Sequence, residues 1–188
     1  MPSSLRGRVA SIGIGSRAVP AFDVDNGGAA TAVVQHLLAT GRRRIAMVTG
    51  PHWMPCARRS VDAFRETVRA ADLPVRLVAG DFTAASGRTA AREALRRWPD
   101  TDAIFAISDA TALGTLSELR RRGADVPGDI AVAGFDDIPF AALSAPALTT
   151  ASHPVDRIAT AAVRAILNGR AAVPVTVFGS ELIRRESA

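Results

Sequence analysis

Short apolar runs alternate with amphipathic segments along most of this chain. Four runs of four or five residues stand out, at positions 45–48, 75–78, 103–107 and 130–133. Their starts lie 30, 28 and 27 residues apart, which is the length of a strand, a crossover helix and a return. Because the runs are apolar without alternation, the pattern predicts parallel strands that are buried on both faces.

The segments around these runs carry the helical period. In residues 27–40 an apolar side chain recurs at i, i+3, i+4, i+7 and i+8, namely Ala30, Val33, Val34, Leu37 and Leu38. Segments 56–71, 86–98, 109–122 and 154–167 show the same kind of stripe. In the helix expected at 56–71, Ala71 should be the last buried residue of the apolar stripe. Asp109 should cap the N-terminus of the helix expected at 109–122. In the last, the residues expected to face inward are Val155, Ile158, Ala162, Val163 and Ile166.

The rhythm changes toward both ends. Four segments resemble short strands, namely 9–14, 19–24, 173–178 and 181–184. Gly169 is expected to end the last helix. A loop is expected over residues 135–153, which include Pro139 and Pro146. Strands that alternate with one-striped helices predict an α/β fold, a doubly wound parallel sheet.

Composition and charge exclude several classes of protein. With 48% hydrophobic and 22% charged residues, the chain is an ordinary globule. It has no apolar stretch near the ~20 residues of a membrane span, and its start lacks the apolar centre of a signal peptide. We therefore expect a cytoplasmic protein that does not contact a membrane.

The net charge of +5 is typical of a nucleic-acid binder, but another interpretation is simpler. All 23 basic residues are Arg, and Lys and Tyr are both absent. A GC-rich coding bias produces that composition without selection for DNA contact. Cys56 is the single cysteine, so an internal disulfide is excluded. Without a CxxC pair or a His cluster, we expect neither a metal nor a cofactor.

Polar and aromatic residues follow each predicted strand. Residues 50–53 (GPHW), 80–82 (GDF), 108–109 (SD) and 134–137 (GFDD) come directly after the four runs. In an open parallel sheet, ligands bind beyond the carboxyl ends of the strands. A carboxylate that accepts hydroxyls beside an aromatic ring suits a sugar or a nucleoside. We therefore predict that Phe82 and Asp136 contact a small polar ligand in one cleft.

Several stretches together resemble a known family. They are 23–26 (DVDN), 36–48 (HLLATGRRRIAMV), 80–87 (GDFTAASG), 104–114 (IFAISDATALG), 126–137 (VPGDIAVAGFDD), 147–150 (ALTT) and 183–187 (IRRES). Their order over residues 19–187 is similar to that in the effector-sensing core of LacI/GalR-type transcriptional repressors. The resemblance implies a periplasmic-binding-protein type I fold, with two lobes and a small-molecule effector in the hinge cleft. It also implies a homodimer, paired near residues 109–122 and 138–143, whose closure alters operator binding.

The resemblance also assigns roles to residues. Phe82 matches the aromatic that stacks on the effector, and Asp136 matches the acid that accepts sugar hydroxyls. The family usually has Arg where this chain has Ser60, with Arg58 nearby, and it usually has Asn where this chain has Ser108. Both departures remove a side chain that can form several hydrogen bonds.

The resemblance covers only the distal part of the family's architecture. It predicts that residues 1–25 and 150–178 are remnants of the first lobe, and that 26–149 and 179–188 form the second. Family members begin with a helix-turn-helix of about sixty residues. We recognise none in this sequence, so operator DNA is an expected partner only through such a segment.

Three other interpretations remain open. A sugar-binding component of a transporter shares the expected fold. Asp23 and Asp25 resemble the nucleophile motif of haloacid-dehalogenase-type phosphatases, with Asp136 and Asp137 as magnesium ligands, but the Lys of such enzymes is absent. Cys56 beside His52 could be a thiol nucleophile, although a small thiol near a helix start is the simpler reading. A P-loop is excluded because it requires Lys.

Overall fold

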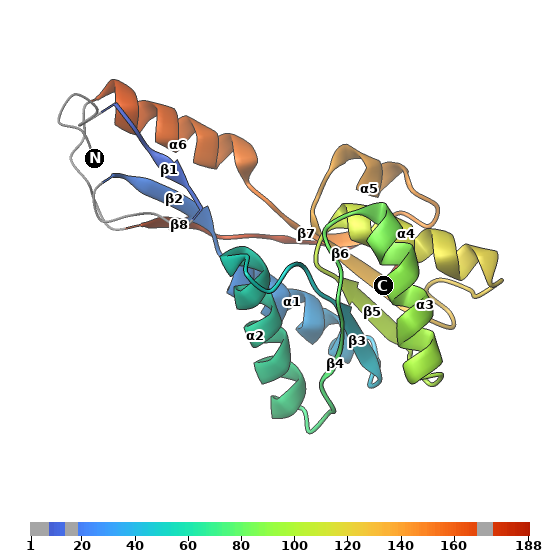
Figure 1. Cartoon of the computed structure of the whole chain (residues 1–188). Coiled ribbons are helices and arrows are strands. Elements are labelled where there is room, and N and C mark those ends of the chain that lie inside the picture. Colours follow the sequence, from blue (N-terminus) through green and yellow to red (C-terminus); the bar gives the residue numbers. More distant parts are fainter. Residues whose placement is uncertain (1–7, 14–18, 169–174) are drawn as a thin grey trace. The chain divides into compact units, whose positions relative to one another are not determined.

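The computed structural model describes residues 8–13, 19–168 and 175–188 (Figure 1). The chain divides into two compact units. Unit 1 consists of Met1–Asp25 and His153–Ser180, and unit 2 of Asn26–Ser152 and Glu181–Ala188. Each unit has its own sheet, of three strands in unit 1 and six in unit 2. The identification of unit 1 with a first lobe remains a prediction.

Unit 2 is built on a mainly parallel sheet with the strand order β4-β3-β5-β6-β7-β9. Its strands are β3 (Ile45–Val48), β4 (Arg76–Val78), β5 (Ala103–Ala106), β6 (Ala131–Asp136), β7 (Thr149–Ser152) and β9 (Leu182–Ile183). Only the β7–β9 pair is antiparallel. The four apolar runs are therefore strands β3 to β6, as the sequence predicts.

Helices cover both faces of this sheet. The pair α1 (Asn26–Ala39) and α2 (Pro55–Ala70) lies on one face, and α3 (Ala84–Arg97) and α4 (Asp109–Arg121) lie on the other (Figure 1). The predicted stripes face the sheet, as the buried side chains of Val33, Phe64 and Leu119 show. This arrangement is the predicted doubly wound α/β fold.

The prediction of a loop over residues 135–153 is wrong. Strand β6 continues to Asp136, a short helix α5 (Pro139–Leu143) follows, and β7 occupies Thr149–Ser152. The sequence of β7 is TTAS, which looks polar in isolation. Its threonine hydroxyls are satisfied inside the fold, because Thr149 Oγ1 accepts from the Arg185 amide at 2.9 Å and Thr150 donates to Asp109. Hydrogen bonding thus allows a polar strand to be buried.

Two further expectations about burial are wrong in unit 2. Strand β4 is half-buried at Arg76 and Leu77 because it lies at the edge of the sheet. Ala71 is exposed because α2 ends one residue before it. Local periodicity predicts which residues form an element but not whether a neighbour covers it.

The described part of unit 1 is smaller. Strands β1 (Ser11–Ile12), β2 (Ala21–Val24) and β8 (Thr176–Phe178) form a parallel sheet in the order β1-β2-β8, against which α6 (Val155–Leu167) packs. The predicted positions Ile14, Gly169, Val173 and Pro174 lie outside the described residues.

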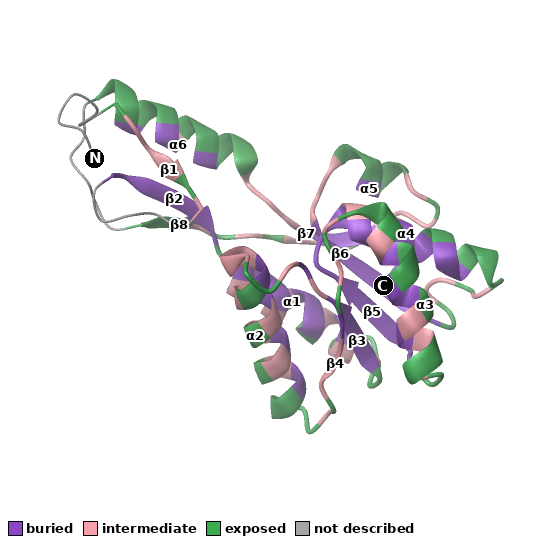
Figure 2. Ribbon diagram, viewed as in Figure 1, coloured by how far each residue is buried: buried purple, intermediate pink, exposed green. Residues whose placement is uncertain are grey.

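Helix α6 buries less of its apolar surface than the sequence predicts. Ile158 and Ala162 are buried, whereas Val155, Val163 and Ile166 are 59%, 53% and 37% exposed. The exposure of Val155 and Ile166 agrees with the expectation that an incomplete first lobe leaves this helix partly uncovered, but the burial of Ile158 and Ala162 does not. Figure 2 shows an exposed outer side and a few buried positions toward the sheet. In the described residues, a three-stranded sheet is too narrow to cover the whole stripe. Within the same residues, no helix has the length and hydropathy to cross a bilayer.

Candidate functional site: the carboxyl edge of the unit 2 sheet

Unusual backbone geometry gathers at one edge of the unit 2 sheet. Among the described residues, four that are not glycine have a positive φ. Phe82 (φ 70°) follows β4, while Asp136 (φ 118°) and Asp137 (φ 55°) lie at the end of β6. Only Asp72 (φ 56°), beyond α2, lies elsewhere. Such conformations cost on the order of 1–3 kcal/mol each and cluster where function requires them.

The ring of Phe82 lies against the loop after β3. A side-chain carbon at Gly50 would be 2.6 Å from that ring, so only glycine fits beneath it. The Phe82 carbonyl accepts the Ser108 hydroxyl at 3.4 Å. Asp81 closes the turn by accepting the Thr83 amide at 3.0 Å and the Thr83 hydroxyl at 2.7 Å. Hydrogen bonds from Ser86 and Thr83 lower the pKa of Asp81, so the turn carries an ionised carboxylate.

The two aspartates at the end of β6 are half-buried. Asp136 stands in register with Ser152 on β7. The carboxylate of Asp137 accepts from Arg185 Nη2 at 2.7 Å, and Nη1 of the same guanidinium donates to the Leu148 carbonyl at 2.8 Å. The side chain after Asp136 is therefore fixed to the segment that enters β7.

Asp109 is buried between α4, β7 and the loop after β6. The Thr150 hydroxyl donates to its Oδ1 at 2.6 Å, and the Ile138 amide donates to its Oδ2 at 2.9 Å. Burial raises the pKa of Asp109 to about 6, and the charges of Asp136 and Asp137 act in the same direction, whereas these two hydrogen bonds oppose the shift. The predicted capping role of Asp109 is wrong: the cap is Ser108, whose hydroxyl accepts from the Thr111 amide.

The remaining predicted site residues lie on α4 and α2. Ser108 is buried, and its hydroxyl lies 3.0 Å from that of Thr111. Ser60 is also buried and donates to the carbonyls of Asn26 and Cys56 at 3.4 and 3.3 Å. Arg58 is exposed on the first turn of α2. Phe82 and Ser108 thus come after β4 and β5, Asp136 ends β6, and α2 begins at the same edge of the sheet.

Sequence reasoning missed two residues at this edge. It noted the loop 50–53 without assigning a role to Trp53. The Trp53 indole is 72% exposed in this loop, so its ring is accessible from solvent. It did not identify Thr150, because strand β7 itself was missed. A buried threonine directly after another threonine offers no periodic signal of its own.

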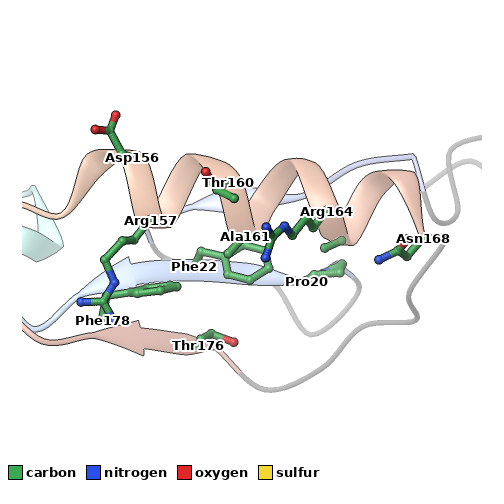
Figure 3. Close-up of a pocket in the computed structure, with 11 residues that line it drawn as sticks. Pro20, Phe22, Asp156, Arg157, Thr160, Ala161, Arg164, Asn168, Thr176 and Phe178 are labelled. Atoms are coloured by element: carbon green, nitrogen blue, oxygen red, sulfur yellow. The ribbon is translucent and has the colours of Figure 1, made fainter.

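A hollow of about 630 Å³ lies in unit 1 (Figure 3). It extends from Pro20, before β2, to Phe178, at the end of β8, and is bordered by α6. The Arg157 guanidinium stands over the Phe178 ring, 5.4 Å from its centre. The hollow is lined by the sheet and by α6 rather than by loops that follow several parallel strands, where ligands of such sheets usually bind.

Asp23, on which the phosphatase interpretation depends, has a local hydrogen bond. Asp23 belongs to unit 1, is buried, and accepts the Val24 amide at 2.8 Å, whereas Asp136 belongs to unit 2. In the described ranges, no group of three or more His, Cys, Asp or Glu is placed to hold a metal ion.

Comparison with known proteins identifies the family. Residues 34–188 match the model of the periplasmic binding protein-like domain. The chain is 37% identical over 183 residues to the HTH-type transcriptional regulator CelR of Thermobifida fusca, covering 94% of this chain and 54% of that protein. It is 34% identical over 179 residues to the HTH-type transcriptional regulator MalR of Streptomyces coelicolor, covering 89% and 52%.

A solved structure supports the same assignment. The complex of the transcriptional regulator CelR with cellobiose superposes with a TM-score of 0.86 at 34% identity, over 95% of this chain and 58% of that one. The chain spans about half the length of the curated relatives it matches. The implied fold is confirmed, and the chain belongs to the periplasmic binding protein-like domain family, as found in LacI-type transcriptional regulators.

Proposed function

We propose that this chain is the effector-sensing portion of a LacI-type transcriptional regulator and that it binds a sugar at the carboxyl edge of the unit 2 sheet. The observation that carries the proposal is the backbone geometry of Phe82, Asp136 and Asp137, which brings three costly conformations to one edge. Strain of this kind persists only where the surroundings fix it. This geometry supports a site in which the Phe82 ring and the Asp136 carboxylate act together.

The chemistry of these two groups suits a sugar. An aromatic ring packs against the C–H face of a pyranose, and an ionised carboxylate accepts hydrogen bonds from its hydroxyls. Arg58, exposed at the start of α2, adds a donor. Ser60 and Ser108 are predicted contacts as well, but both hydroxyls are buried and already donate within the fold, so a weaker contribution is expected from them. The structure of CelR with cellobiose supports a sugar as the ligand class.

The regulatory role follows from the relatives, which are named as transcriptional regulators. In this role the chain binds its effector without converting it, and it acts in the cytoplasm, where operator DNA is located. DNA contact comes from a helix-turn-helix segment, and the effector-binding portion associates with a second copy. The exposed apolar residues Phe140 and Leu143 on α5 support that association.

Amide NMR titration of this chain with cellobiose and ribose at millimolar concentrations tests the ligand and its location together. We expect shifts in residues 50–54, 80–83, 107–109 and 135–138. The variant Asp136→Asn should bind about tenfold more weakly or worse, because a hydrogen bond to a charged group contributes about 1.5–3 kcal/mol. Asp72→Asn is the matched control, since Asp72 also has a positive φ but lies beyond α2. Shifts confined to the hollow of unit 1, or none with either sugar, would overturn the proposal.

A further inference from the structure

The carboxylate of Asp109 joins three elements of unit 2. It belongs to the first residue of α4, accepts the hydroxyl of Thr150 on β7 and accepts the amide of Ile138 directly after the strained pair. Gly134 on β6 leaves room for it, because a side-chain carbon there would collide with Asp109 Oδ1. One buried group thus fixes the loop after β6 relative to its neighbouring strand and helix.

Helix capping does not account for this burial. Ser108 already caps α4 through the Thr111 amide. An unpartnered carboxylate in a buried position is costly, and Asp136 and Asp137 add like charges nearby. Two short hydrogen bonds offset that cost: one donor, the Ile138 amide, belongs to the loop after Asp136, and the other, the Thr150 hydroxyl, belongs to β7.

Two hydrogen bonds hold the second residue of the strained pair and the residue after it. Asp137 is tied by Arg185 at 2.7 Å, and the next residue, Ile138, is tied by Asp109 at 2.9 Å. Positive φ values in two consecutive non-glycine residues relax unless such contacts fix them. Loss of the Asp109 contact would therefore move the Asp136 carboxylate.

We propose that Asp109 is a positioning residue for effector binding: through Thr150 and the Ile138 amide it holds the loop that presents Asp136 to the ligand. This inference rests on the proposed function. Asp109 itself is buried and does not touch the ligand. The proposal adds a residue to the site for which the sequence indicated only a capping role.

The test uses three variants of buried threonines. For each variant, cellobiose affinity is measured by titration, and the exchange rate of the Ile138 amide is measured without ligand. Thr150→Val removes the hydroxyl that donates to Asp109 and keeps the shape, whereas Thr150→Ser keeps the hydroxyl. Thr115→Val is the matched control, because Thr115 is also buried on α4 and its hydroxyl bonds to the Thr111 carbonyl instead. We expect Thr150→Val to bind about tenfold more weakly, and its Ile138 amide to exchange about tenfold faster. Both controls should stay within about twofold of the original chain.

A second pair covers the case in which Thr150→Val does not fold. In Asp109→Asn the amide oxygen can accept from Ile138 while the NH2 group donates to Thr150, so affinity should fall by about threefold at most. Asp109→Ser cannot reach both partners and should lose about tenfold. Unchanged affinity and unchanged Ile138 exchange in Thr150→Val or Asp109→Ser would overturn the inference. If the original chain binds no sugar, the proposed function fails, and exchange at Ile138 still decides whether Asp109 anchors the loop.

Discussion

The hydroxyl of Thr150 donates to the carboxylate of Asp109 at 2.6 Å, and both residues are buried although 41 positions separate them in the sequence. This bond connects β7, which the sequence analysis did not predict, to α4, which it did predict. It keeps a carboxylate in a buried place beside two other acids. Its ionisation should therefore affect the stability of the fold.

Asp109 should make stability depend on pH between about 4 and 6. Its pKa rises from 3.8 to about 6 in the folded chain, so the folded state binds more protons than the unfolded state in that window. Stability from this group is full below pH 3.8 and declines as pH rises through 6, by about 3 kcal/mol for two units. Urea unfolding of the original chain and Asp109→Asn at pH 4 to 7 measures it. The free energy of unfolding of Asp109→Asn, relative to that of the original chain, should rise from pH 4 to about pH 6 and stay constant above about pH 7. A difference that does not change with pH would contradict this prediction.

Glu118 should show the opposite pH dependence. Hydrogen bonds from Arg92 and Arg122, at 2.9 to 3.2 Å, lower the pKa of Glu118 to about 2. Its contribution is present above pH 4.5 and is lost as pH falls toward 2. We expect Glu118→Gln to cost about 1 kcal/mol at pH 7, because its arginine partners are partly exposed. The difference from the original chain should shrink on acidification.

The control for Glu118 is a similar carboxylate on the surface. Glu93→Gln removes pairs to Arg96 and Arg97 on the solvent-exposed side of α3, where water and salt screen the attraction and little stability should be lost. Equal losses in the two variants at pH 7 would mean that the buried position of Glu118 has no energetic effect.

Gly50→Ala should displace the Phe82 ring. The added carbon would lie 2.6 Å from two ring atoms and 3.1 Å from Ala57 Cβ, closer than unbonded carbons approach. We expect a folded protein that binds cellobiose about tenfold more weakly, as Phe82→Ala should, since the stacking surface moves. Gly179→Ala is the control because nothing lies within 4 Å of its added carbon. Full affinity in Gly50→Ala would show that the ring does not contact the sugar.

Much of the unit 2 fold could be predicted because its signals are local. The runs that became β3 and β5 are buried throughout, and α1 has the predicted stripe. Strand β7 could not be predicted, because the burial of Thr149 and Thr150 depends on partners at Arg185 and Asp109. Phe82 and Asp136 remain predictions as ligand contacts, and they were singled out because each comes just after an apolar run of the sequence. Asp109 was misread because a residue at a helix start looks like a cap until Ser108 is seen to fill that role.

Exposed apolar side chains predict self-association of the isolated chain. On α6, Val155, Val163 and Leu167 are exposed, and on α5 so are Phe140 and Leu143. At about 25 cal/mol per Å2, covering even a few hundred Å2 of such surface yields several kcal/mol. We expect light scattering at about 50 μM to show a dimer or a larger assembly, which requires a net association free energy of about 6 kcal/mol or more after the entropic cost of binding. The pair Val163→Gln and Leu167→Gln should lower the average mass, and so should Phe140→Ser with Leu143→Ser. If the unaltered chain is a monodisperse monomer with slow amide exchange along α6, these faces are stable in water and association with a second copy must be rejected.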